Sequence, residues 1–242
     1  MISIFDDFLF EKKLKISYNR THKKSFPLIY RNFMKSFLIC FCLFWLSISL
    51  SYGQDSQVSS LGEKVGNVMV RGRPVPVYQV AEIEANSTSD GIQGFAIQVA
   101  YWLHQWTAVH AVEAIANLCH TPHGKEWGAR VLTVYAHTSS PITNACPNGM
   151  VLSTWAIHSH PQGTRYRANA VDKLFLRQEL RDNPIIGTQP DDFSVADFQA
   201  GHGYMVGATG LHLNDGKWHA TQIWNMNKPD PYPTPNITLS QN

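Results

Sequence analysis

The sequence predicts a single α/β domain in which a mixed β-sheet is flanked by helices. The chain has 242 residues, 44% of them hydrophobic, which suits one core of ordinary size and is too short for two large domains. From Ile92 to Leu118 Gly and Pro are almost absent and apolar residues recur every three or four positions, which predicts a helix or a helix pair. Strand patterns follow at 125–135, 154–160, 203–208 and 218–224, the last two around an Asn-Asp-Gly hairpin signal.

The N-terminal region has the plan of an export signal. Residues 34–53 combine a positive start, an apolar run and small residues, which predicts cleavage before Gln54. The run is shorter than the ~20 residues of a spanning helix. We therefore expect a secreted or periplasmic protein with no stable membrane insertion after cleavage, an uncleaved anchor being the alternative. Residues 1–33 form an extension, either a long positive n-region or, as we favour, a segment upstream of a translation start at Met34.

Beyond the signal, composition divides the chain into three parts. Residues 54–90 read as an extended lead-in that contains an edge strand or arm at 68–78, because apolar and polar residues alternate there around two prolines. The expected folded domain covers 91–228, and residues 229–242 form a Pro-rich tail.

The distribution of charge argues against a nucleic-acid partner. Residues 1–53 hold eight of the 20 Lys and Arg residues but three of the 18 Asp and Glu residues. The remainder therefore has a net charge of −3 and lacks the basic surface on which nucleic-acid binding relies.

Two cysteines, Cys119 and Cys146, remain after the signal is removed. In an oxidising compartment they are candidates for one disulfide. Two buried thiols are the alternative, because a disulfide requires that the two Cα atoms lie close together.

A pair of histidines at the end of a strand is the first candidate for a metal site. His158 and His160 are separated by one residue, so they project from the same face of the predicted strand, whereas Ser159 points the other way. Pro161 ends the strand. Imidazole is a favoured zinc ligand, and two imidazoles leave positions open for a third ligand and a water.

Other segments supply candidate partners for these histidines. Glu126 begins the predicted strand 125–135, which we expect to neighbour the histidine strand. Ser194 and Asp197 are three residues apart at the start of a predicted helix with Asp192 as its N-cap, so they share one helical face. One helical turn could then offer a carboxylate to a metal ion and a hydroxyl to a nearby oxygen.

The order Glu, His-Ser-His-Pro, Ser-x-x-Asp resembles the JAMM motif of the JAB/MPN superfamily of zinc metalloproteases, especially bacterial secreted or toxin-associated members. The likeness covers residues 109–210 and includes Glu126-Trp127-Gly128. It implies a JAB/MPN-like fold for 91–228, in which His158, His160 and Asp197 bind Zn²⁺. It further implies that Glu126 is the general base and Ser194 stabilises the oxyanion.

The spacing departs from the family pattern, because 161–193 separates the second histidine from Ser194 by far more residues than is usual. The loop-closure cost of such an insertion grows slowly with its length. Residues 163–190 are rich in Arg and predict a short exposed helix and a loop, either a solvated insert or a lid over the substrate.

The resemblance implies a zinc-dependent peptidase or isopeptidase that hydrolyses an amide bond with a metal-activated water. Compartment alone suggests a peptide or protein substrate, either a cell-envelope peptide or a protein of a target cell. The alternatives are a catalytically silent JAB-like binding module of a secreted effector and, with less support, zinc sequestration.

Overall fold

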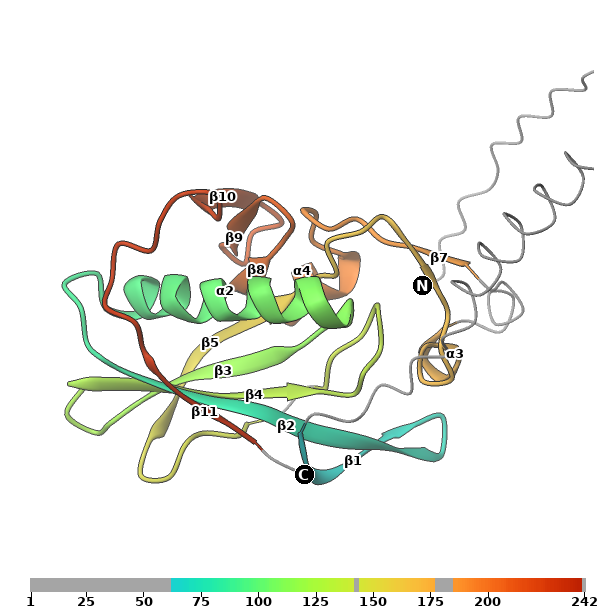
Figure 1. Cartoon of the computed structure of the whole chain (residues 1–242), viewed down its shortest axis with the longest axis horizontal. Helices are drawn as coiled ribbons and strands as arrows, with labels where there is room; N and C mark the ends of the chain where they lie inside the picture. The colour runs from blue at the N-terminus through green and yellow to red at the C-terminus, as the bar shows by residue number, and fades with distance from the viewer. Residues whose placement is uncertain (1–61, 142–143, 177–184, 241–242) are drawn as a thin grey trace, which may run out of the picture. The chain divides into compact units, whose positions relative to one another are not determined.

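The fold is built on a mixed sheet of nine strands, and one long helix packs against it (Figure 1). The computed structural model describes residues 62–141, 144–176 and 185–240. The predicted signal peptide and the extension before it lie outside the described residues. The predicted α/β class with a mixed sheet is confirmed for the described part of the chain, which has a large mixed sheet and few helices.

The strands of the large sheet follow the order β1-β2-β4-β3-β5-β8-β9-β10, and β11 pairs with β2. Only the pair β5–β8 is parallel among the strands described. The strands are β1 (Glu63–Val70), β2 (Arg73–Asn86), β3 (Ile115–His120), β4 (Glu126–Thr133), β5 (Val151–Ser159), β8 (Gly203–Val206), β9 (Gly210–Asn214), β10 (Ala220–Asn225) and β11 (Asn236–Leu239).

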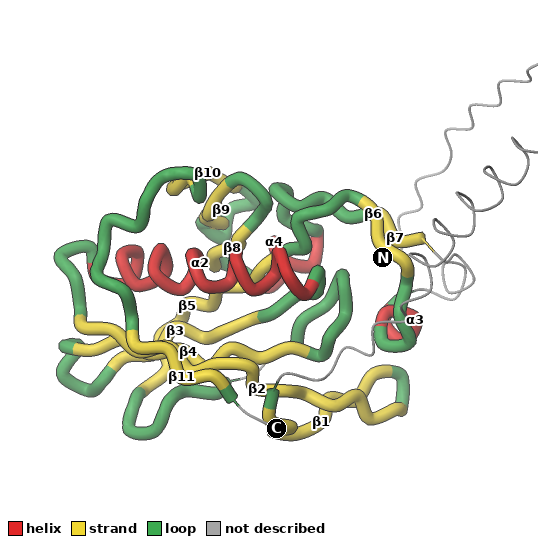
Figure 2. The backbone as a smooth tube through the Cα atoms, viewed as in Figure 1, coloured by secondary structure: helices red, strands yellow, loops and turns green. Residues whose placement is uncertain are grey.

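Helix α2 (Gly91–His110) covers one face of the sheet (Figure 2). Phe95, Val99 and Leu103, four residues apart, are each at most 1% exposed, as the helical spacing of the sequence predicts. They pack in the main core with sheet residues such as Ile83 and Ile157. The helix thereby packs against β5, the strand that carries His158 and leads directly to His160.

The helix is shorter than predicted, and residues 115–120 form a strand. Ala111 adopts a left-handed conformation with φ of 56°, and its N–H bonds the carbonyl of Thr107 at 2.8 Å, which ends α2. Ala116 and Leu118 are then buried with the period of a strand. The prediction of a helix over 111–118 was wrong. A short apolar run fits both the helical and the strand period, and the sequence alone does not distinguish them.

The segments expected to flank the domain contribute strands to the sheet. β1 and β2 come from the region read as a lead-in, and β2 pairs with β1, β4 and β11. β11 lies within the tail read as irregular, with Ile237 opposite Ile83. The hairpin signal at Asn214 is confirmed, but the strand before the turn is β9, and β8 is a separate strand.

The segment between β5 and the helix α4 (Val195–Ala200) contains a small second sheet and one helical turn. Strands β6 (Arg165–Arg167) and β7 (Ile185–Gly187) pair with each other, and α3 is Asp172–Phe175. Hydrophobic residues of α3 pack on a second core cluster that includes Leu132 and Val134. The described part of this segment is therefore packed against the domain, and whether it acts as a lid stays a prediction.

Cys119 of β3 forms a disulfide with Cys146, with Cα atoms 5.8 Å apart. Of the two alternatives left open by the sequence, the structure has the bonded one. The bond ties the loop after β4 to a central strand across a separation of 27 residues.

We expect Cys146→Ser to lower the free energy of unfolding by about 3 kcal/mol, because the unfolded chain regains the entropy of a closed loop. Urea unfolding followed by tryptophan fluorescence measures the change. The exposed Asn144→Ser in the same loop is the control and should change stability by less than about 0.5 kcal/mol. A Cys146→Ser variant as stable as the wild type would contradict the prediction.

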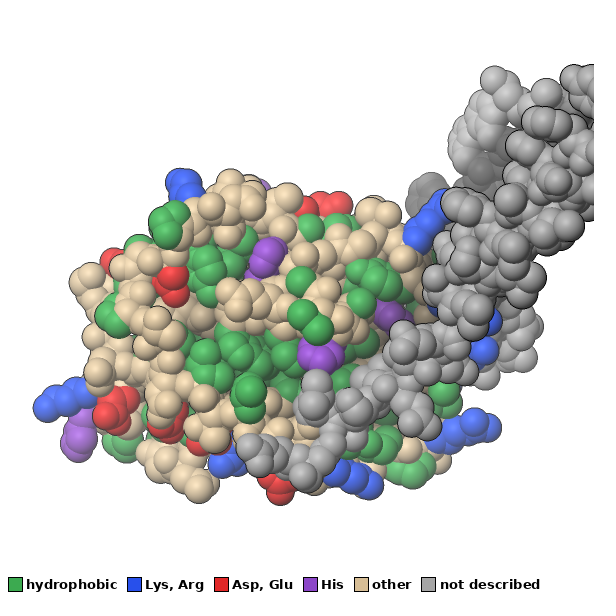
Figure 3. Space-filling model, in the orientation of Figure 1, with side chains coloured by type: hydrophobic (Ala, Val, Ile, Leu, Met, Phe, Trp, Pro, Cys, Tyr) green, Lys and Arg blue, Asp and Glu red, His purple; other side chains and the backbone are tan. Residues whose placement is uncertain are grey.

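Hydrophobic side chains gather on the side of the molecule shown in Figure 3, around α2. Helix α2 is nevertheless no membrane span: none of the helices in the described ranges is both long enough and apolar enough to cross a bilayer.

Candidate metal centre

The two histidines lie at the end of β5, as the sequence predicts. His158 is the penultimate residue of the strand, and His160 follows its last residue. Ser159 points away from them into the core and is fully buried. Its hydroxyl accepts hydrogen bonds from the Thr107 hydroxyl at 2.8 Å and from the Ala114 N–H at 3.2 Å. The strand end that presents the histidines is thereby bonded to α2 and to the start of β3.

Asp197 reaches the histidines from α4. Ser194 is the N-cap of this helix, with its hydroxyl accepting from the Asp197 N–H at 3.3 Å, while Asp197 Oδ2 accepts from the Ser194 N–H at 2.7 Å. This reciprocal capping box fixes the orientation of the carboxylate. The predicted face shared by Ser194 and Asp197 is present, but the predicted N-cap, Asp192, is not the residue that caps the helix.

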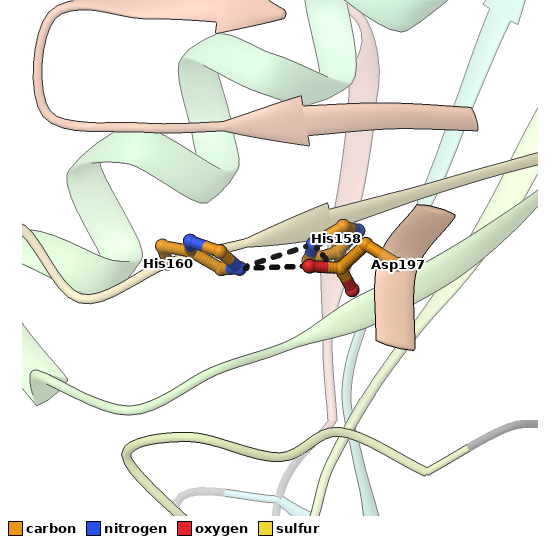
Figure 4. A group of neighbouring side chains, drawn as sticks. All are labelled: His158, His160 and Asp197. Carbon is orange, nitrogen blue, oxygen red and sulfur yellow. Dashed lines mark hydrogen bonds and ion pairs between the residues drawn. The ribbon is translucent and has the colours of Figure 1, made fainter. Parts of the chain in front are cut away.

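The three side chains form a group that can hold a metal ion (Figure 4). His158 Nε2 lies 3.2 Å from His160 Nε2 and 3.4 Å from Asp197 Oδ1, and His160 Nε2 lies 3.7 Å from Asp197 Oδ2. Tetrahedral ligands at zinc bond lengths of about 2.0–2.1 Å lie about 3.3–3.4 Å from one another. The distance between the two imidazole nitrogens and the distance from His158 Nε2 to Asp197 Oδ1 are close to this spacing, so the group could hold one metal ion.

Hydrogen bonds to backbone groups orient both imidazoles. His160 Nδ1 lies 3.2 Å from the carbonyl oxygen of Gln189, and the ring of His158 hydrogen-bonds the backbone of Tyr204. When Nδ1 of His160 donates to a carbonyl, Nε2 keeps its lone pair, which faces the other two side chains. Such outer hydrogen bonds are typical of metal-binding histidines.

Burial keeps the imidazoles neutral. It lowers the pKa of His158 to about 4, although the nearby Asp197 charge acts in the opposite direction. Burial likewise lowers the pKa of His160. Metal ions bind the neutral form of histidine, so near neutral pH protons compete weakly for these nitrogens.

Glu113 is a fourth member of the site that the sequence reading missed. It lies between α2 and β3, where its N–H donates to the Ala136 carbonyl at 2.8 Å. Its Oε1 is 3.9 Å from His160 Nε2, and the residue is 8% exposed. Burial raises the pKa of Glu113 well above its usual range, and the negative charges of Asp197 and Asp172 raise it further. A carboxyl group with a raised pKa can both accept and donate a proton near neutral pH.

Glu126 is not brought to this group. The strand register places His158 opposite Ile115 and Ile115 opposite Leu132, six positions from Glu126 along β4. At about 3.3 Å per residue, Glu126 is about 20 Å away along the strand. Glu126 is exposed and lines a separate cavity with Glu84. The expectation that Glu126 faces the histidines is wrong. Strand β3 lies between β4 and β5 and is antiparallel to both, so β4 runs in the same direction as β5 and its first residue, Glu126, lies at the opposite end from the histidines.

Ser194 is hydrogen-bonded to Asp197, a member of the site. Its hydroxyl oxygen already accepts a hydrogen bond in the capping box. A serine hydroxyl can accept and donate at once. The proposed contact of Ser194 with an oxyanion stays a prediction.

Comparisons with protein-family models, with curated proteins and with solved structures find no match. The protein has a mixed α/β fold and a His-His-Asp group that could hold a metal ion.

Proposed function

We propose that the protein is a zinc-dependent hydrolase of amide bonds, a peptidase or isopeptidase of the JAMM type with a JAB/MPN-like fold. The observation that carries the proposal is the spacing of His158, His160 and Asp197 together with the buried carboxyl of Glu113 beside them. Two imidazoles and one carboxylate leave a coordination position for water, as in catalytic zinc sites and unlike closed structural ones.

Each residue has a defined part in this proposal. His158, His160 and Asp197 would hold the ion, which would supply Lewis acidity to activate water and polarise the substrate carbonyl. Glu113 would accept a proton from the attacking water and deliver it to the leaving amine as the C–N bond breaks. Ser194 would donate a hydrogen bond to the developing negative oxygen.

The proposed compartment rests on the predicted signal at residues 34–53 and on the disulfide between Cys119 and Cys146. Disulfides form and persist outside the reducing cytosol. These two features support a secreted or periplasmic protein, and with it a cell-envelope peptide or a protein of another cell as substrate.

Metal analysis of the purified protein tests the proposal. We expect one zinc ion per chain, and we expect His158→Ala and Asp197→Ala each to lower zinc affinity by more than about 100-fold, because each removes a direct ligand. Titration with a chromophoric zinc chelator measures the affinity, and mass spectrometry of a peptide library measures cleavage.

The exposed His219→Ala is the matched control, since it removes an imidazole from the same domain but from outside the group. It should keep full zinc affinity. A protein that binds no zinc, or that binds it equally well without His158, would end the metal-centre proposal. Zinc bound as expected without cleavage of any peptide would favour the binding module instead.

A further inference from the structure

A row of aromatic rings runs from the candidate metal centre to the surface. The ring of Phe193 lies 6.0 Å from that of His158 and 5.6 Å from that of Phe198. Phe198 in turn stacks on Trp218, with centroids 5.2 Å apart and an interplanar angle of 17°. We call Phe193, Phe198 and Trp218 the aromatic row.

The outer end of the aromatic row is open to solvent. Trp218 is 60% exposed, and Val195, on the same helix as Phe198, is 63% exposed. No residue of α4 is buried. A single exposed apolar side chain is ordinary, but an exposed indole stacked on a second ring, in a row that leads to a polar site, indicates a binding surface.

Trp218 is held in an unfavourable backbone conformation. Its φ is 60°, in the left-handed region that costs a bulky residue free energy and that turns usually assign to Gly or Asn. Burial offers little compensation for this cost, because Trp218 is largely exposed. Strain kept at an exposed aromatic residue points to a role in binding.

Side-chain hydrogen bonds fix the aromatic row relative to the metal centre. The side-chain amide of Asn214, which is 1% exposed, donates to the carbonyls of Asp197 at 3.3 Å and Gly201 at 2.6 Å. Its side-chain oxygen accepts from the Gly216 N–H at 3.0 Å. One buried residue thus joins the turn that carries Trp218 to the helix that carries Asp197 and Phe198.

We propose that the aromatic row is a substrate subsite that binds an apolar side chain, aromatic or large aliphatic, of a peptide whose scissile amide lies at the metal centre. The proposal rests on the proposed function. The occupant follows from continuity: the row begins beside His158 at Phe193, is built of three rings, and ends at the exposed ring of Trp218. An extended peptide advances about 3.3 Å per residue, so the row lies within a few residues of the bond to be cut.

Binding measured without cleavage tests the subsite. The probes are end-blocked alanine hexapeptides that contain a single Phe, Leu, Asp or Lys, titrated by calorimetry into zinc-loaded protein with the substitution Glu113→Gln. We expect the Phe and Leu peptides to bind about tenfold more tightly than the all-alanine peptide, because they bury apolar area on the rings. We expect Trp218→Ala in the same background to reduce that preference to less than about twofold.

The exposed Val109→Ala is the matched control, since it removes apolar surface from α2, and it should keep the tenfold preference. Equal binding of all peptides, or a preference unchanged by Trp218→Ala in protein with the wild-type melting temperature, would overturn the subsite. Because no bond has to break, a protein that shows the preference but never cleaves would contradict the hydrolase proposal and leave the subsite standing.

Discussion

Replacing Glu113 with Gln is expected to lower kcat for amide hydrolysis by about 10²- to 10⁴-fold while the protein keeps its zinc. Gln keeps the size of the side chain and its place beside His160, but it cannot take up the proton of the attacking water. Steady-state cleavage of a peptide found in the library screen gives kcat, and metal analysis of the same sample gives zinc content.

Glu126→Gln is the control that the structure supplies. Both substitutions remove one carboxylate, but Glu126 is exposed and lies at the far end of β4 from the histidines. Its kcat should stay within about twofold of the wild type, because Glu126 is about 20 Å along the strand from the histidines and cannot reach the reacting atoms. The opposite result, with Glu126→Gln inactive and Glu113→Gln active, would sink the assignment of the base to Glu113.

Asp172→Ala is expected to lower the free energy of unfolding by about 3–5 kcal/mol, because it removes a fully buried carboxylate and leaves several half-buried donors without their acceptor. Asp172 is fully buried. Its carboxylate accepts from the N–H and the Nδ1 of His137 and from the Asn169 N–H, each at 2.7 Å. Urea unfolding of the variant and the wild type measures the difference.

The exposed Asp192→Ala, from the same connecting segment, should change stability by less than about 0.5 kcal/mol and serves as control. If Asp172→Ala unfolds at the wild-type urea concentration, the segment between β5 and α4 is not anchored through this carboxylate. Since the Asp172 charge also raises the pKa of Glu113, the variant gives a second readout in the pH profile of cleavage.

Several parts of the fold and the site follow from local patterns in the sequence. A strand that ends in His158 and His160 needs only the alternation of side chains and the proline after it. The helical turn of Ser194 and Asp197 needs only the spacing of a capping box. These signals are local, so they hold whatever the rest of the chain does.

The choice between Glu113 and Glu126 depends on which way the strands run, and no local pattern encodes that. The sequence nevertheless contains a signal for Glu113: between Asp90 and Lys125 it is the only Asp, Glu, Lys or Arg. A lone ionisable group in an apolar stretch is costly to bury unless it has a partner or a function. The sequence reading placed 111–118 in a helix and did not use this signal.

The parallel pairing of β5 with β8 has a consequence for how the metal centre behaves during folding. Two parallel neighbours need a long connection, and here it starts at the histidines and returns past Asp197. Helix α4 has six residues, none of them buried, and so short a helix has little stability of its own. An ion shared by His158, His160 and Asp197 would connect the two ends of this crossover. The free energy of metal binding would then contribute directly to the free energy of folding of the crossover.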